Sequence, residues 1–291
     1  MLDGTSLPIR EFKLEWMCEN PSICMIAKRG SGKSWVVRAI LNHFKDIPGG
    51  VIISPTDRMS SFYGKFFPEA FIFYQYKSEI IEKMLYRQEL IIEKEKQKAK
   101  EGKRIDPRAF LVMDDCLSSK GSWVKDEPIM KMFFDGRHYK IMYILTMQFP
   151  LGIQPELRCN FDYIFLLAED FMSNQKRLYD HYAGMFPTFD SFRHVFLELT
   201  EDFGCMVIVN RGSKKTFLDK VFWYKAGAQA ITRIGNSQFN EFHKNNFDPE
   251  WRLKKKGFDM RQFVTDKKKA SFKITKVNVQ DQQEMEENGY Y

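Results

Sequence analysis

Residues 27–34 read Ala-Lys-Arg-Gly-Ser-Gly-Lys-Ser, and this stretch decides the fold class. It matches the phosphate-binding loop pattern G-x-x-x-x-G-K-[ST] everywhere except the first position, where alanine replaces glycine. An apolar run at 23–27 precedes the loop, and residues 34–44 after it carry apolar side chains at helical spacing. A strand, a glycine-rich turn and a helix in this order predict a phosphate-binding loop. The alternative is a purely structural glycine-rich turn.

Each fixed position of such a loop has a chemical reason. Glycines let backbone N–H groups curl around a phosphate, and the helix N-terminus adds its dipole. Lys33 then reaches the β- and γ-phosphates of a nucleotide, and the Ser34 hydroxyl ligates Mg²⁺. Arg29 either contacts the nucleotide or points to solvent, and we favour solvent. The predicted nucleotide-binding residues are Ala27, Lys28, Arg29, Gly30, Ser31, Gly32, Lys33, Ser34 and Trp35.

Further apolar runs predict the remaining strands of a sheet. Residues 78–103 lack proline and predict a long helix, with Ser78 as its N-cap, Gly102 as its stop and a solvent-exposed polar second half. Strands separated by helices require parallel crossovers, so we expect a three-layer α/β P-loop fold with a mostly parallel central sheet. The predicted strands are residues 23–27, 51–54, 71–74, 110–113, 141–146, 163–167 and 205–209.

Polar residues follow two of these runs and complete the predicted site. Asp114 and Asp115 end the run 110–113, at the sheet edge where open α/β sheets bind ligands. We expect Asp114 to hold Mg²⁺ and Asp115 to polarise the attacking water. Gln148, after the run 141–146, either senses the γ-phosphate or makes an ordinary hydrogen bond at a strand end.

Phosphoryl transfer also needs positive charge near the transition state, often from an arginine of a neighbouring subunit. Arg137 and Arg158 flank the predicted strand that bears Gln148, and each is either such an arginine or part of a surface salt bridge. We interpret His138 as structural. The aromatic residues of this region are expected to be core residues, namely Phe133, Phe134, Phe161 and Phe165.

Composition sets the class of protein. The 291 residues contain 45 Lys and Arg against 38 Asp and Glu, with 44% hydrophobic residues, which indicates a globular chain with a buried core. No apolar run approaches the roughly 20 residues of a membrane span, and charged residues within the first twenty argue against a signal peptide. We therefore expect a soluble protein that is not secreted. The five scattered cysteines indicate reduced thiols.

The charge is concentrated near the C-terminus. Residues 251–276 contain ten Lys and Arg against two Asp, a local charge of +8, and the last fifteen residues carry −4. This basic stretch is interleaved with phenylalanines, so it either neutralises phosphates and stacks on bases or is a solvated, partly disordered tail. We predict an ATPase domain at 1–225 and a C-terminal extension at 226–291, basic and then acidic.

The motifs in their order along the chain resemble a known family. AKRGSGKS, VIISPT, FLVMDD, DGRHYKIMYILTMQFP and PELRCNFDYIFLL are similar to segments of the DNA-packaging ATPases of nucleocytoplasmic large DNA viruses, the poxvirus type included. These ATPases belong to the FtsK/HerA superfamily of P-loop motors. The resemblance spans roughly residues 23–167 and continues more weakly to about 223.

The resemblance implies an ATPase that uses ATP and Mg²⁺, assembles as a hexameric or pentameric homo-oligomeric ring and drives double-stranded DNA into a preformed capsid. It implies that Lys33 and Ser34 bind the nucleotide and its Mg²⁺ and that Asp114 also holds Mg²⁺. It further implies that Asp115 is the general base and that Gln148 is the sensor of the γ-phosphate. Its expected partners are DNA of any sequence and viral capsid proteins, in the host cytoplasm, at the viral factory, and in the virion. DNA would contact residues 118–125 or the basic tail through its phosphates.

This sequence departs from the wider pattern at Ala27 and at Asp115, where the superfamily usually has glycine and glutamate. Two groups of alternatives stay open. One is a helicase or a ring ATPase that acts on protein, although a helicase would show further motifs in a second lobe. The other is a nucleotide-binding switch without catalysis, or a capsid-associated scaffold, in which these two departures mark a decayed site.

Overall fold

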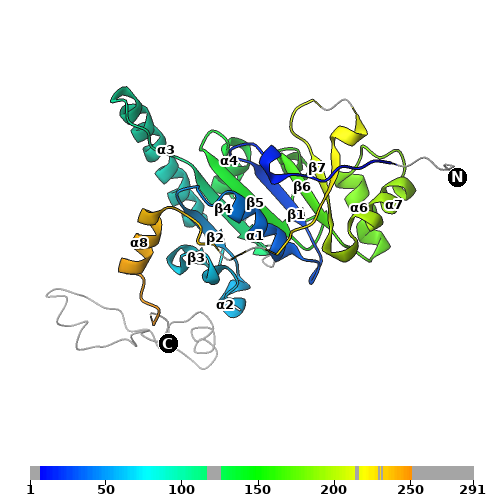
Figure 1. Cartoon of the computed structure of the whole chain (residues 1–291), viewed down its shortest axis with the longest axis horizontal. Coiled ribbons are helices and arrows are strands. Elements are labelled where there is room, and N and C mark those ends of the chain that lie inside the picture. The colour runs from blue at the N-terminus through cyan, green and yellow to red at the C-terminus, as the bar shows by residue number, and fades with distance from the viewer. Residues whose placement is uncertain (1–6, 117–125, 214–215, 229, 231, 251–291) are drawn as a thin grey trace, which may run out of the picture. The chain divides into compact units, whose positions relative to one another are not determined.

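The computed structural model describes residues 7–116, 126–213, 216–228, 230 and 232–250 (Figure 1). The chain divides into two compact units, Met1–Asn245 and Asn246–Tyr291, and the sheet belongs to the first. The predicted DNA-contacting residues 118–125 and the tail from 251 onward, with its predicted disorder, lie outside the described residues. The domain boundary at 225 stays a prediction.

The apolar runs of the sequence form one eight-stranded sheet. Its strands are β1 (Ser22–Ile26), β2 (Gly50–Ile53), β3 (Ile72–Phe73), β4 (Ala109–Asp114), β5 (Ile141–Met147), β6 (Tyr163–Leu167), β7 (Cys205–Val209) and β8 (Val221–Tyr224). Their order is β3-β2-β4-β5-β1-β6-β7-β8. Every neighbouring pair from β3 to β6 is parallel, and the pairs β6–β7 and β7–β8 are antiparallel. The mostly parallel sheet and the seven predicted strands are confirmed, whereas β8 was not predicted.

Helices cover both faces of the sheet and make three layers (Figure 1). The helices are α1 (Lys33–His43), α2 (Asp57–Ser60), α3 (Ser78–Lys100), α4 (Glu127–Asp135), α5 (Pro155–Arg158), α6 (Met172–Tyr182), α7 (Phe189–Leu199) and α8 (Ser237–Asn246). Buried side chains of α3, α4, α5, α6 and α7 pack on one face, and those of α1 pack on the other. The three-layer expectation is therefore confirmed.

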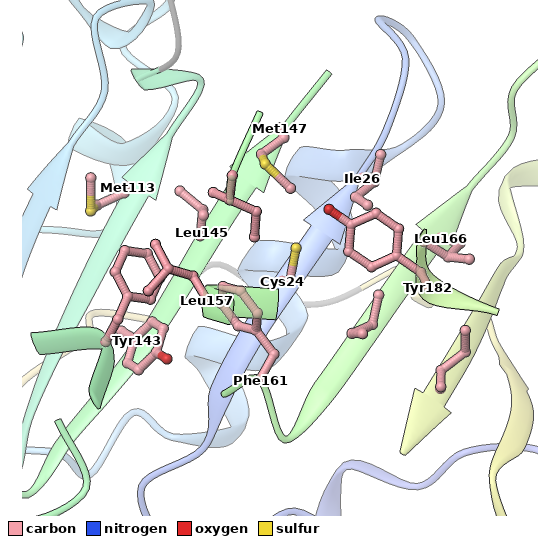
Figure 2. Packing of buried hydrophobic residues seen from close by; sticks show 14 of the residues in the cluster. Cys24, Ile26, Met113, Tyr143, Leu145, Met147, Leu157, Phe161, Leu166 and Tyr182 are labelled. Atoms are coloured by element: carbon pink, nitrogen blue, oxygen red, sulfur yellow. The ribbon is translucent and has the colours of Figure 1, made fainter. Parts of the chain in front are cut away.

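Side chains of β1 alternate between the two faces and fix the central strand of the fold. Cys24 and Ile26 point to the first face, whereas Ile23 and Met25 point to the second. Figure 2 shows the first face, where side chains of β1, β4, β5 and β6 meet Leu157 and its neighbours. A strand that is buried on both faces must be apolar throughout, which is why these strands appear as continuous apolar runs in the sequence.

The long helix α3 differs from its prediction at its start. Its N-cap is Lys77, so the prediction of Ser78 as the N-cap was wrong, because the Ser78 hydroxyl donates to Oδ1 of Asp126 at 3.0 Å instead. The helix ends at Lys100, and Gly102 stops it as predicted, because its φ of 72° turns the chain so that the N–H of Lys103 donates to the carbonyl oxygen of Lys98 at 2.9 Å. No residue beyond Gln88 in α3 is buried, so its second half is exposed as predicted.

Both edges of the sheet are short or covered. β3 has only two residues. At the opposite edge, the N–H of Phe12 donates to the carbonyl of Trp223 at 2.7 Å, and the N–H of Trp223 donates to the carbonyl of Arg10 at 3.1 Å. The N-terminal segment therefore pairs with part of β8.

Gly50→Ala tests the close packing of β2 against β4. A Cβ on Gly50 would lie 2.1 Å from the carbonyl oxygen of Phe110, so the two strands must separate. We expect the free energy of unfolding to fall by about 1–3 kcal/mol in urea titrations. Gly184→Ala is the matched control, because a Cβ there meets nothing within 4 Å. Equal unfolding midpoints for the two variants would contradict the packing argument.

Candidate active site

The loop between β1 and α1 folds as a glycine turn that leads into the N-terminus of α1. Gly30 and Gly32 have φ angles of 81° and 93°, which residues with a side chain rarely adopt. The hydroxyl of Ser31 donates to the carbonyl oxygen of Lys28 at 2.8 Å and closes the turn. Gly32 is the N-cap of α1, so the first N–H groups of the helix and its positive dipole end lie at the loop. This geometry suits a bound anion.

Ala27, the departure from the loop pattern, belongs to the strand side of the loop. Its N–H donates to the carbonyl oxygen of Met147 at 2.9 Å, which extends the pairing of β1 with β5 by one residue. Its side chain is buried in the apolar cluster that also contains α1. Because its φ is not positive, this position does not require glycine.

Lys33, the first residue of α1, reaches the end of β4. Its Nζ lies 3.3 Å from Oδ1 of Asp114 and forms an ion pair with Oδ2 of Asp115. The three side chains have exposed fractions of 12%, 8% and 15%. A carboxylate at such depth is costly without a partner, and one lysine here compensates two.

Asp114 is held by side chains from the ends of the two neighbouring strands. The hydroxyl of Thr146, in β5, donates to its Oδ1 at 2.5 Å. The hydroxyl of Ser54, just after β2, donates to its Oδ2 at 3.4 Å. Three parallel strands therefore orient one buried carboxylate.

Asp115 has an unusual backbone conformation and an incompletely bonded side chain. Its φ is 52°, in the left-handed region that only a few per cent of non-glycine residues occupy. Its N–H donates to the hydroxyl of Thr146 at 3.2 Å, and Nε2 of Gln148 donates to its Oδ2 at 3.0 Å. Its Oδ1 is buried and has no hydrogen-bond partner among the described residues. Such strain and such an oxygen are typical of functional sites.

Sequence reasoning missed three residues of this site. Thr146 and Ser54 were assigned only to strands, although the parallel register that pairs Asp114 with Thr146 would have revealed the first. Tyr63 is buried nearby, and burial together with the negative charge of Asp114 raises the pKa of its hydroxyl well above the usual value. Tyr63 therefore stays neutral.

The other residues of the loop face outward. Lys28 forms an ion pair with Asp170, and Arg29 is exposed. Trp35 is 49% exposed, and the guanidinium carbon of Arg38 lies 4.2 Å from the centroid of its ring. The Ser34 side chain is half-buried in the first turn of α1.

Arg137 and Arg158 do not reach the loop in their own subunit. Arg137 lies at the N-terminal ends of the parallel strands, whereas the loop lies at their C-terminal ends. Its Nη2 donates at 3.1 Å to Oδ1 of Asp162, a buried carboxylate just before β6. Arg211 also approaches this oxygen, at 3.6 Å. Arg158 is buried, and its guanidinium donates to the carbonyl oxygen of Ile153 at 2.8 and 3.2 Å. The surface salt bridge considered for Arg158 is therefore wrong.

The aromatic residues near these arginines divide into core and surface. Phe133, Phe161 and Phe165 are buried as predicted. Phe134 is 53% exposed, so its assignment to the core was wrong; it lies on the side of α4 opposite the buried Met132 and Phe133. His138 is exposed in the turn before β5. All five cysteines are free thiols.

The chain is similar in fold to a viral packaging protein. The genome packaging NTPase B204 of Sulfolobus turreted icosahedral virus 2, solved with sulfate, aligns with a TM-score of 0.51 and 13% identity over 74% of this chain and 100% of that chain. Its complex with AMPPCP gives the same TM-score and identity over 72% and 100%. The chain therefore shares the α/β fold of this NTPase, with a glycine turn of the phosphate-binding type between β1 and α1.

Sequence comparison identifies viral relatives. Protein L437 of Acanthamoeba polyphaga mimivirus is 50% identical over 84% of this chain and 85% of its own length. Protein 088R of Invertebrate iridescent virus 3 is 33% identical over 77% of this chain and 87% of its own. The chain belongs to the family of viral proteins that includes these two. No protein-family model matches it. No helix among the described residues is long and apolar enough to cross a membrane.

Thr146→Val tests the support of the two carboxylates. The variant keeps the shape of the side chain but loses the hydroxyl that bonds Asp114 and the N–H of Asp115. We expect the free energy of unfolding to fall by about 1–3 kcal/mol, because the N–H of Asp115 loses the Thr146 hydroxyl as its acceptor and the carboxylate of Asp114 loses one of its donors. Thr216→Val removes an exposed hydroxyl that bonds Asp219 at 2.7 Å and should change stability by less than about 0.5 kcal/mol. A loss no larger than in this control would contradict the prediction.

Proposed function

We propose that the protein is an Mg²⁺-dependent ATPase that assembles as a homo-oligomeric ring, a hexamer or a pentamer, and drives double-stranded DNA into a viral capsid. The observation that carries the proposal is the convergence of Lys33, Asp114, Asp115 and Gln148 beside the phosphate loop. The shared fold with a genome packaging NTPase supports the packaging role. Viral capsid proteins are the proposed partners, at the viral factory of the host cytoplasm.

Nucleotide binding would use the ion pairs of Lys33. The ammonium group of Lys33 is shared between two carboxylates. A triphosphate in the loop would draw Lys33 toward the β- and γ-phosphates, because a phosphate carries more charge than either carboxylate. Asp114 and Asp115 would then lose part of their compensating charge and would favour a cation.

The residues present fit Mg²⁺. Mg²⁺ usually takes one or two protein oxygens together with waters and substrate phosphates rather than a full protein cage. Asp114 and Ser34 supply oxygens of this kind, and no group of three or more His, Cys, Asp or Glu in the described part of the chain could hold a metal alone. Oδ1 of Asp115 has no hydrogen-bond partner among the described residues and so can accept a further hydrogen bond. Bound Mg²⁺ supplies positive charge to the phosphate oxygens.

Asp115 would act as the general base. Its Oδ1, buried and without a hydrogen-bond partner among the described residues, would accept the proton of the attacking water once the site rearranges around a nucleotide, whereas its Oδ2 is bonded to Lys33 and to Gln148. Gln148 therefore responds to any movement of Asp115, which supports its role as the sensor of the γ-phosphate. Thr146 keeps both carboxylates in place, since it bonds the side chain of one and the N–H of the other.

Arg137 is the arginine that we propose acts in a neighbouring subunit. Its side chain is 63% exposed at the N-terminal ends of the parallel strands, opposite the ends that carry its own phosphate loop. The ion pair with Asp162 orients this side chain without burying it. A residue that completes the site of the next subunit in a ring must lie away from its own site. Arg158 fits this role less well, because its guanidinium is buried and bonded within its own chain.

DNA stimulation tests the motor. Wild type is expected to hydrolyse ATP faster with double-stranded DNA at low salt, and the stimulation should fade as salt rises because the contacts go to phosphates. Lys33→Ala should abolish hydrolysis, and Lys83→Ala, which changes an exposed lysine of α3, should not. Steady-state rates across a salt series measure both effects. Hydrolysis that is indifferent to DNA would contradict translocation, and ATP binding without turnover would favour a nucleotide switch.

Subunit mixing tests the arginine in trans. Asp115→Asn and Arg137→Ala should each lower kcat by about 10²-fold or more while ATP still binds. An equimolar mixture should regain activity, because some interfaces then combine an intact Asp115 with an intact Arg137. Rates of the mixture and of the separate variants measure this. A mixture no faster than its components would contradict the assignment of Arg137 to the neighbouring site.

A further inference from the structure

The turn of residues 201–203 lies at the same end of the strands as the phosphate loop, namely where the parallel strands have their C-terminal ends. β7 is antiparallel to β6, and Cys205 at its start pairs with Leu167 at the end of β6. β6 is in turn parallel to β1, where Leu166 pairs with Ile26. The residues just before β7 therefore lie near the C-terminal end of β1, where the chain enters the phosphate loop. They lie on the side of β1 away from Asp114 and Asp115, because β5 and β4 are on its other side.

Phe203 packs directly against the loop. A Cβ on Gly32 would lie 3.5 Å from both Cβ and Cδ1 of Phe203. The Phe203 side chain is nevertheless 62% exposed. An aromatic ring so exposed contributes little to folding through burial. Its position beside the loop therefore needs another explanation than core packing.

The protein holds this ring in a fixed place. Asp202 and Phe203 have φ angles of 47° and 61°, two consecutive left-handed residues that are not glycine. Asp202 forms an ion pair with Lys225, and the N–H of Gly204 donates to the carbonyl oxygen of Glu201 at 2.8 Å. The turn is thus braced on both sides of Phe203.

Trp35 is another exposed aromatic residue near the loop, and it is less suited to receive a ligand ring. The guanidinium of Arg38 already lies 4.2 Å from the centroid of its indole, so one face is covered. No described ring or cation stacks on Phe203 in this way.

We propose that Phe203 is a binding residue for the nucleoside part of the bound nucleotide, with the face of the base resting on its ring. The inference rests on the proposed nucleotide binding and adds to it the contact that the loop lacks. Backbone N–H groups and Lys33 hold phosphates by charge, whereas a base offers an uncharged π-face that an aromatic ring can bind. Stacking of this kind tolerates different bases, so adenine and guanine nucleotides would both use it.

The test compares ligands with and without a nucleoside. Dissociation constants are measured by calorimetry for ATP, GTP and inorganic tripolyphosphate on wild type, Phe203→Ala and Phe203→Tyr. Phe203→Ala should weaken ATP and GTP roughly 5- to 150-fold and leave tripolyphosphate unchanged. Phe203→Tyr should keep the affinity of wild type. Tyr86→Ala is the matched control, because Tyr86 is also 62% exposed but lies on α3.

Each outcome decides the proposal. An equal loss for ATP and tripolyphosphate would mean that Phe203 only shapes the loop, and unchanged ATP affinity would mean that the ring does not touch the nucleoside; both overturn it. Wild type that binds tripolyphosphate but not ATP would overturn both this inference and the proposed ATPase. Thermal unfolding of each variant serves as the folding control, and its midpoint should match that of wild type because the Phe203 side chain is exposed.

Discussion

The ion pairs between Lys33 and the two carboxylates at the end of β4 are the interaction on which the rest of the site depends. They join the phosphate loop and α1 to a strand two places away in the sheet, since β5 lies between β1 and β4. Two adjacent carboxylates would repel one another at this depth without a cation. The lysine that we propose contacts a nucleotide is therefore also the residue that compensates both carboxylates.

In the proposed function, this arrangement would couple nucleotide binding to the neighbouring strands. Asp114 is bonded from β5 and from the end of β2, and Asp115 is bonded to Gln148 at the end of β5. Movement of Lys33 toward a phosphate would change the charge that all of these groups experience. The antiparallel strands β7 and β8 carry no part of this network. The turn before β7 instead places the ring of Phe203 beside the phosphate loop.

The sequence predicted the parts of the fold that depend on local pattern. The central strands are buried on both faces, so their apolar runs were plain, and the glycine turn followed from its motif. Contacts between distant segments were not predictable in this way. Ser78 bonds Asp126 across 48 residues rather than capping its helix, and Thr146 reaches Asp114 only through the sheet register. The burial of Arg158 and the strand β8 likewise depend on tertiary neighbours.

The covered edges of the sheet bear on how copies of the chain can meet. Exposed strand edges are templates for pairing with another chain, and proteins avoid this by shortening or covering them. Here one edge strand has two residues, and the N-terminal segment pairs with Trp223 at the other edge. Strand addition between copies is therefore disfavoured on both sides. Copies of the chain that meet would therefore contact one another through side chains and would not form a continuous sheet by strand pairing.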